Sequence, residues 1–340
     1  MKRVGYLYEK IYDIENLRAA HKEARKDKSF YSEVRWVDSN EEYALNKIRD
    51  MLKNNEYTVS PEDYKISERN DKGKMRTLHI LDYYPHRIIQ WAIILQIGDV
   101  LEKTFISTSY ASIKGRGTLK ASKDLRKAIS DSEYNYFLKM DIRKFYPNID
   151  REILKGILRK KFKDKKLLSL LDLLIDSSPD SKGIALGSLL SQWLGNFYLT
   201  YFDHYVKEVL RCKHYFRYCD DLIILGKNRE ELKRIKSLIT KYLSDNLYLE
   251  VKPNWSCRHI RDGIDFVGYV HFRDKVLLRR GIKYSLRRSC HRLNNKTKRG
   301  KKLTNNDRST IGSYYGWTKH CDGRGLYKTY IRHLNSKLEE

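Results

Sequence analysis

The sequence of 340 residues has no apolar run close to the roughly 18–20 residues that a membrane-spanning helix requires. Residues 91–97 form one of its longest apolar stretches. No apolar segment follows the basic N-terminal residues, so we expect no secretory signal. Only 18 glycines and 5 prolines are present and no repeat is visible, which excludes collagen-like and solenoid folds. We therefore expect a protein without a membrane partner.

Cysteine is also scarce, because the five cysteines are an odd number with no C-x-x-C pair. This usage argues against a disulfide framework and predicts reduced thiols in a cytoplasmic compartment. Three cysteines have a histidine nearby: Cys257 near His259, Cys290 beside His291, and Cys321 beside His320. Their spacings match no standard zinc site, so ordinary surface or core positions are the better interpretation.

Positive charge is abundant, with 69 Lys and Arg against 43 Asp and Glu and a formal net charge of +26. An excess of this size predicts a polyanionic partner, and nucleic acid is the first choice. Hydrophobic residues make up 41% of the chain, enough for a sizeable core. The length allows two domains or one large one.

Residue patterns predict several helices and one basic hairpin in the first two thirds of the chain. We expect a helical, basic region over residues 1–70, and a hairpin with cations at its tip over residues 70–81. Residues 84–101 and residues 187–210 are apolar nearly all round, which predicts two buried helices. Asn228 and Glu231 have capping-box spacing and open a predicted helix through residue 243.

Two apolar segments carry acidic residues and are predicted to be strands. Residues 136–142 form one strand with Asp141 near its end, and residues 214–226 form a hairpin with Asp220 and Asp221 at its turn. Another hydrophobic hairpin is expected at residues 263–272. A dense cationic segment follows at residues 279–302, and aromatic-rich helices close the chain around Tyr314, Tyr315 and Trp317.

The three aspartates predict a divalent-cation site. Neighbouring carboxylates in apolar surroundings repel each other, so Asp220 and Asp221 favour a cation that neutralises them. If Asp141 converges on them, the set can hold two Mg²⁺ ions about 4 Å apart, with Mn²⁺ as a substitute, for an in-line phosphoryl displacement. For an isolated Asp-Asp pair, a simple polar turn is the better interpretation.

The sequence around these acids resembles the ordered motifs of reverse transcriptases. The matching pieces are Lys74 and Arg76, residues 141–146 (DIRKFY), residues 186–192 (LGSLLSQ), residues 218–221 (YCDD), residues 249–252 (LEVK) and residues 265–269 (DFVGY). A single Y-x-D-D is weak, whereas this many pieces in the family's order are specific. The resemblance implies an RNA-directed DNA polymerase with an α+β right-hand fold, made of fingers, a palm with an antiparallel sheet, and a helical thumb.

The resemblance also implies a division of the chain. Residues 1–70 would form an N-terminal helical extension, residues 71–272 the fingers and palm, and residues 273–340 the basic helical thumb. Asp141, Asp220 and Asp221 would be catalytic metal ligands, with Asp221 in a supporting role and the backbone carbonyl of Ile142 completing the shell.

Other positions are expected to bind the incoming dNTP. Lys74 and Arg76 would hold the triphosphate, unless they are simply a solvated basic turn. Tyr146 would lie beneath the sugar, with Phe145 as the alternative, and a core role for either is a rival. Gln192 and Lys252 occupy the family's positions near the nucleotide.

Residues near the C-terminus are expected to bind the primer–template duplex. Phe266, Gly268 and Tyr269 resemble the primer grip. The basic thumb would grip phosphates through Arg279, Arg280, Lys283, Arg287 and Arg288, unless this is an ordinary solvated face.

The motif with Leu186 is most similar to that of the reverse transcriptases of diversity-generating retroelements. Their L-G-x-x-x-S-Q form replaces the usual glutamine by Leu186, which can form no side-chain hydrogen bond. We hypothesise that Leu186 lowers fidelity opposite adenine, although simple core packing is the alternative. The resemblance implies that a template-repeat RNA is copied into cDNA for mutagenic retrohoming, together with a small basic accessory protein, in a bacterial, archaeal or phage-encoded element.

Other functions stay open on sequence alone. The nearest alternative is a retron, group II intron-derived or phage-defence reverse transcriptase. A metal-dependent nuclease using the same acids and a non-catalytic RNA-binding module are the alternatives from other classes.

Overall fold

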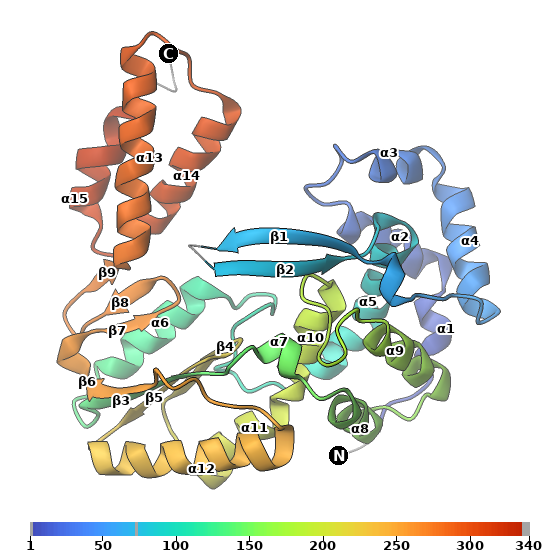
Figure 1. Cartoon of the computed structure of the whole chain (residues 1–340), viewed down its shortest axis with the longest axis horizontal. Coiled ribbons are helices and arrows are strands. Elements are labelled where there is room, and N and C mark those ends of the chain that lie inside the picture. The colour runs from blue at the N-terminus through green and yellow to red at the C-terminus, as the bar shows by residue number, and fades with distance from the viewer. Residues whose placement is uncertain (1–2, 72–73, 335–340) are drawn as a thin grey trace. The chain divides into compact units, whose positions relative to one another are not determined.

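The computed structural model describes residues 3–71 and 74–334 (Figure 1). The chain divides into two compact units. The first unit is built from residues 1–107, 142–209 and 239–252, and the second from residues 108–141, 210–238 and 253–340. Helix α12 (Arg229–Leu247) contributes residues to both. The predicted functional divisions after residues 70 and 272 follow the chain order and stay predictions.

The first unit is mainly helical. Its helices are α1 (Tyr8–Ile11), α2 (Ile14–Ala24), α3 (Ser32–Ser39), α4 (Glu41–Lys53), α5 (Ile88–Glu102), α7 (Phe145–Asn148), α8 (Arg151–Lys161), α9 (Lys165–Asp176), α10 (Leu189–Tyr198) and α11 (Thr200–His204). Shorter helical turns are η1 (Pro61–Asp63), η2 (Tyr83–Arg87) and η3 (Tyr205–Val209). Helix α5 is apolar on most of its surface and is buried along most of its length, which explains its central place among α1, α2 and α10.

The first unit also contains the basic hairpin that the sequence predicted. Strands β1 (Lys65–Asp71) and β2 (Lys74–Ile80) pair antiparallel, with Arg69 opposite Arg76. The backbone amide of His79 donates to the carbonyl of Leu186 at 2.7 Å. This hydrogen bond joins the end of the hairpin to the loop that precedes α10.

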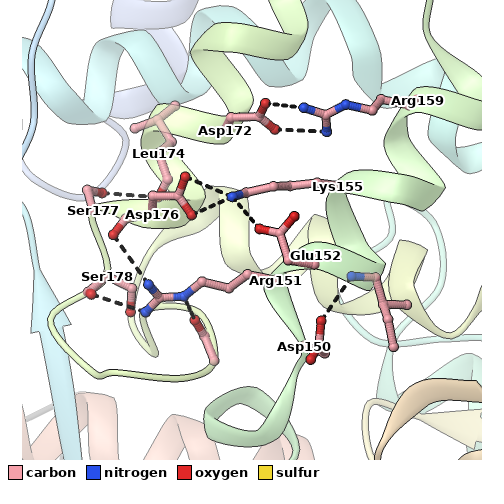
Figure 2. A network of polar contacts seen from close by, with 12 residues as sticks. Asp150, Arg151, Glu152, Lys155, Arg159, Asp172, Leu174, Asp176, Ser177 and Ser178 are labelled. Atoms are coloured by element: carbon pink, nitrogen blue, oxygen red, sulfur yellow. Dashed lines mark hydrogen bonds and ion pairs between the residues drawn. The ribbon is translucent and has the colours of Figure 1, made fainter.

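Helices α8 and α9 of the first unit are tied together by charged side chains (Figure 2). Asp150 and Asp164 cap the two N-termini by accepting hydrogen bonds from backbone amides. Lys155 reaches Asp176 at 2.7 Å, and Figure 2 shows Arg159 meeting Asp172 through both of its terminal nitrogens. These ion pairs link α8 to α9.

The second unit contains a four-stranded antiparallel sheet in the order β4-β5-β3-β6. Its strands are β3 (Tyr136–Asp141), β4 (Tyr215–Tyr218), β5 (Asp221–Gly226) and β6 (Ser256–His259). Helix α6 (Thr118–Ile129) packs Leu125 and Ile129 against sheet residues such as Phe137. The predicted strand at residues 136–142 and the hairpin at residues 214–226 are confirmed, whereas β6 was not predicted.

A smaller antiparallel sheet and the C-terminal helices complete the second unit. The sheet contains β7 (Ile264–Phe266), β8 (Tyr269–His271) and β9 (Val276–Leu278), and it confirms the hairpin predicted at residues 263–272. The helices are α13 (Arg280–Lys298), α14 (Asn305–Lys319) and α15 (Arg324–Leu326), followed by η5 (Tyr327–Ile331); η4 (Ile260–Asp262) precedes the sheet. Leu286 and Ile311 pack in their common core.

Three expectations from the sequence need correction. The helix predicted over residues 187–210 is divided into α10, α11 and η3, with a break at Leu199 between α10 and α11. The helix predicted over residues 84–101 is divided into the helical turn η2 and α5 from Ile88, and within η2 the residue before proline, Tyr84, is extended. The region over residues 1–70 is mainly helical but ends in strand β1 from Lys65, and it is not basic, since it carries 14 Lys and Arg and 14 Asp and Glu.

The α+β class with antiparallel sheets is confirmed. Within the described part of the chain, no helix combines the length and the apolar character needed to cross a bilayer.

Candidate active site

Three carboxylates gather at one end of the four-stranded sheet in the second unit. Asp141 is the last residue of β3 and Asp221 the first of β5, and the two are direct cross-strand partners. Asp220 precedes Asp221 in the tight β4–β5 turn, where Cys219 has a left-handed backbone with φ of 57°. The strand register therefore brings acids 80 residues apart in the sequence to adjacent strand ends.

Asp221 has the electrostatic surroundings of a cation ligand. Burial, together with the nearby charges of Asp141 and Asp220, raises the pKa of Asp221 to about 6, while Lys139 acts in the opposite direction. Its Oδ1 atom is buried and forms no hydrogen bond with any described residue. A buried carboxylate oxygen without a donor is destabilising unless a cation or a proton reaches it.

The donor chemistry of this cluster fits a hard divalent cation such as Mg²⁺ or Mn²⁺. Asp141, Asp220, Asp221 and the carbonyl of Ile142 are the groups that would hold it. Within residues 3–71 and 74–334, no three acidic, histidine or cysteine side chains are already grouped as a metal site.

Lys139 is a charged neighbour of the acids that sequence reasoning missed. Its ammonium lies 3.7 Å from Asp221 Oδ2 and donates to the carbonyl oxygen of Asp265 at 2.5 Å. The carboxylate of Asp265 in turn accepts from Arg279 Nε at 2.5 Å. Lys139 and Asp141 are two residues apart in the same strand, so their side chains point to the same face of the sheet. This spacing could have identified Lys139 from the sequence.

Arg217 is a second residue that the sequence did not identify. Its side chain is one of the largest fully buried ones, and its Nη1 donates to the carbonyl of Cys219 at 3.1 Å. Its backbone amide donates to the carbonyl of Thr108 at 2.9 Å, and its carbonyl accepts from the amide of Tyr110 at 3.0 Å. Arg217 thus supports the turn that carries Asp220.

The expected primer grip is a tight turn between β7 and β8. Val267 and Gly268 both have left-handed backbones, with φ of 45° and 91°. A Cβ atom on Gly268 would lie 2.5 Å from the Trp317 ring, so only glycine fits. Phe266 and Tyr269 are buried, which leaves the turn itself as the surface that could meet a primer.

The residues expected to bind the nucleotide lie in the first unit. Arg76 is exposed on β2, whereas the side chain of Lys74 lies outside what the structure describes. Leu186 is half-buried, and Gly187 follows with φ of 117°, where a Cβ atom would lie 3.1 Å from the His79 carbonyl oxygen. Sequence reasoning did not identify Gln90. Its Oε1 accepts hydrogen bonds from Ser188 Oγ and from the Leu189 amide, both at 3.1 Å, at the start of α10.

The two aromatic residues that follow Asp141, Phe145 and Tyr146, differ in how deeply they are buried. Phe145 is buried, whereas Tyr146 is half-buried, which favours Tyr146 for the expected contact with a sugar. Both rings approach Gly195 of α10, where a Cβ atom would lie 3.0 Å from Tyr146 Cε1. Gln192 is exposed on α10 and Lys252 is half-buried.

The basic thumb segment forms helix α13, whose apolar side is buried and whose cations line the outside. Arg280, Arg287 and Arg288 are exposed, and Lys283 is half-buried. Arg279 precedes the helix and is engaged by Asp265. Further along α13, a surface hollow is lined by Tyr284, Ser285, Arg288, Ser289, His291, Arg292, Asn295, Lys296, Arg299 and Lys301. This composition suits a phosphate backbone.

Comparison with protein families identifies the class of this chain. The family model described as reverse transcriptase (RNA-dependent DNA polymerase) matches residues 66–271. The chain therefore belongs to the reverse transcriptase family, and the right-hand polymerase fold expected from the motifs is that of this family.

Among curated proteins, similar sequences come from intron-encoded proteins. The group II intron-encoded protein LtrA of Lactococcus lactis subsp. cremoris is 27% identical over 60% of this chain and 35% of its own length. The putative COX1/OXI3 intron 2 protein of Saccharomyces cerevisiae is 22% identical over 66% of this chain and 34% of its own. The chain thus spans about a third of the length of these relatives.

Solved structures with a similar arrangement include telomerases. The apo telomerase of Candida tropicalis, truncated from its C-terminal domain, is 14% identical with a TM-score of 0.47, covering 65% of this chain and 56% of its own. The Candida albicans telomerase in complex with a telomeric RNA fragment is 10% identical with a TM-score of 0.47, covering 67% of this chain and 50% of its own.

Proposed function

We propose that this chain is an RNA-directed DNA polymerase. The observation that carries the proposal is the cross-strand pairing of Asp141 with Asp221 beside Asp220, in a chain whose residues 66–271 match the reverse transcriptase family. In the proposed reaction the primer 3′-hydroxyl attacks the α-phosphate of a dNTP, and pyrophosphate leaves. The template RNA, the growing cDNA and the dNTPs are the partners.

The aspartates would hold two divalent cations, together with the carbonyl of Ile142. When bound, Mg²⁺ or Mn²⁺ supplies charge neutralisation at the reacting phosphate. Lys74 and Arg76 would bind the triphosphate, Tyr146 the sugar, and Gln192 and Lys252 the nearby base and phosphates. The turn at Gly268 and the cations of α13 would hold the duplex.

We further propose the diversity-generating subtype, in which adenines of a template-repeat RNA are copied with errors for mutagenic retrohoming. The L-G-x-x-x-S-Q motif supports this subtype. A leucine side chain cannot supply the hydrogen bond of an amide, and such a bond contributes about 1 kcal/mol to discrimination. A small basic accessory protein would act with this enzyme.

A group II intron-derived reverse transcriptase is the second candidate, because the curated relatives above are intron-encoded proteins. The two candidates differ in fidelity. Sequencing cDNA made on a defined RNA by the parent protein and by Leu186→Gln separates them. Frequent errors confined to template adenines, reduced at least threefold by Leu186→Gln, support the diversity-generating subtype. Errors spread equally over the four bases favour the intron-derived candidate.

Primer extension tests the polymerase activity itself. Incubation with a primer on an RNA template, dNTPs and Mg²⁺ should lengthen the primer, and Asp220→Asn should reduce the rate at least 100-fold. Asp262→Asn is the matched control, because Asp262 is exposed and lies in the same unit. Cleavage of the template without extension would instead indicate a nuclease, and tight binding with neither reaction would indicate an RNA-binding module.

A further inference from the structure

Tyr6 in the first unit is an exposed aromatic side chain in an unusual backbone conformation. Its side chain is 83% exposed, and its φ of 59° places it in the left-handed region that non-glycine residues seldom adopt. Such a conformation is strained for a residue with a side chain and persists only where the surroundings impose it.

The chain on both sides of Tyr6 is fixed to the segment that joins α8 to α9. The Val4 amide donates to the Lys161 carbonyl at 2.9 Å, and the Lys163 amide donates to the Val4 carbonyl at 2.8 Å. On the other side, the amides of Leu7 and Tyr8 both donate to the Asp164 carboxylate, at 2.8 and 2.9 Å. Tyr6 is the projecting residue between these two anchors, so its ring is held out to solvent.

One lysine lies over this ring, and two neighbouring lysines lie over other tyrosine rings. The Lys163 ammonium lies 5.3 Å from the centre of the Tyr6 ring, and Lys166 lies 5.9 Å from that of Tyr8. Lys160 lies 5.7 Å from the centre of the half-buried Tyr201 ring. Three lysines within residues 160–166, each over a tyrosine ring, form with these rings what we call the Tyr6 platform: Tyr6, Tyr8, Tyr201, Lys160, Lys163 and Lys166.

The lysines of the platform are available to a ligand. Neighbouring cations on α8 are already engaged, because Arg159 is paired with Asp172 and Lys155 with Asp176 (Figure 2). By contrast, Lys160, Lys163 and Lys166 form no ion pair with any residue in the described ranges. The nearby Asp164 carboxylate is occupied by backbone amides, whose hydrogen bonds lower its pKa against the effect of burial. A hollow beside Tyr6 is lined by Tyr8, Glu9, Lys163 and Lys166.

We propose that the Tyr6 platform binds single-stranded RNA outside the primer–template duplex. An exposed ring offers a stacking surface for an unpaired base, and flanking ammonium groups neutralise the adjacent phosphates. An acidic protein surface would need the cations but not a projecting aromatic ring. The inference goes beyond the proposed polymerase reaction, because it assigns a contact to residues that carry no reverse transcriptase motif.

Binding of a fluorescent 20-nucleotide single-stranded RNA, with a primer–template duplex already bound, tests the platform. Tyr6→Ala should weaken this binding about tenfold, as expected for one lost base stack, whereas Tyr6→Phe should stay within twofold. Tyr248→Ala is the matched control, because Tyr248 is also exposed and left-handed, with φ of 50°. Equal effects of Tyr6→Ala and Tyr248→Ala would overturn the proposal.

Salt dependence tests the lysines. The combined Lys160→Gln, Lys163→Gln and Lys166→Gln variant should lower the slope of log K against log salt by about 2, since each single-strand phosphate contact contributes about 0.7. The control with the same charge change is Lys47→Gln, Lys123→Gln and Lys241→Gln, whose lysines are exposed elsewhere. If both triple variants change the slope equally, only net charge matters and the site is wrong.

Two further ligands define the chemistry. An abasic oligomer of the same length should bind at least fivefold more weakly than the RNA. Equal binding would mean that the platform binds any polyanion and would overturn the proposal that bases stack on Tyr6. The DNA oligomer of the same sequence should compete within fivefold, and failure of both DNA and RNA to bind would also overturn the platform. Primer extension by the parent protein is measured in parallel. If the parent protein binds RNA in a Tyr6-dependent way but does not extend a primer, the polymerase proposal is refuted and the platform is not.

Discussion

The buried imidazole of His271 in β8 makes the stability of the second unit depend on pH. The His271 side chain has no solvent exposure, and its Nδ1 lies 3.2 Å from the carbonyl oxygen of Ile264. Its Nε2 lies 2.8 Å from Ser122 Oγ of α6. A neutral ring satisfies both contacts, with Nδ1–H donating to the carbonyl and Nε2 accepting from the hydroxyl.

Burial lowers the pKa of His271 from 6.5 to about 4 in the folded protein. Between these values the unfolded chain binds a proton that the folded chain does not, so stability is complete above pH 6.5 and falls as the pH decreases toward 4. The full difference corresponds to about 3 kcal/mol, of which about 2 kcal/mol is lost between pH 7 and pH 5.

Urea unfolding of the parent protein and of His271→Gln at pH 7 and pH 5 measures this contribution. The parent should lose about 2 kcal/mol more than the variant between the two pH values, because glutamine does not titrate. His291→Gln is the control, since it makes the same substitution at a histidine that is exposed. Equal losses in the parent protein and in His271→Gln would refute the assignment.

Three further predictions concern the candidate active site. Gly268→Ala should destabilise the protein by about 3 kcal/mol, because alanine is strained in the left-handed backbone and its Cβ clashes with Trp317. Gly281→Ala is the control, because the space around its Cβ is open, and it should be neutral or stabilising. Thermal unfolding measures both. Lys139→Met should slow single-turnover extension about tenfold. It should also move the acid limb of the pH profile to higher pH, because the pKa of Asp221 rises further without this cation. An acid limb that stays at the same pH would contradict the proposed effect of Lys139 on Asp221. Replacing both Arg288 and Arg292 by Gln should reduce the salt slope of duplex binding by about 2, and an unchanged slope would exclude this face of α13.

Local patterns in the sequence were sufficient for much of the fold. Turn residues and alternating apolar residues predicted hairpins at residues 70–81 and 214–226, and the structure has the antiparallel pairs β1–β2, which begins at Lys65, and β4–β5 at these places. The capping pair Asn228 and Glu231 also forms, with the Glu231 amide donating to Asn228 Oδ1 at 2.8 Å. These signals succeed because turn chemistry and side-chain alternation act between residues close in the chain.

The order of motifs along the chain determined the family and the choice of Asp141, Asp220 and Asp221. Tertiary structure alone decided the register that places Asp141 opposite Asp221 and the position of Lys139 beside them. It also decided the anchors that project Tyr6. Each of these depends on contacts between residues about 80 to 160 positions apart, and their geometry follows from packing of the whole unit, which local propensity does not encode.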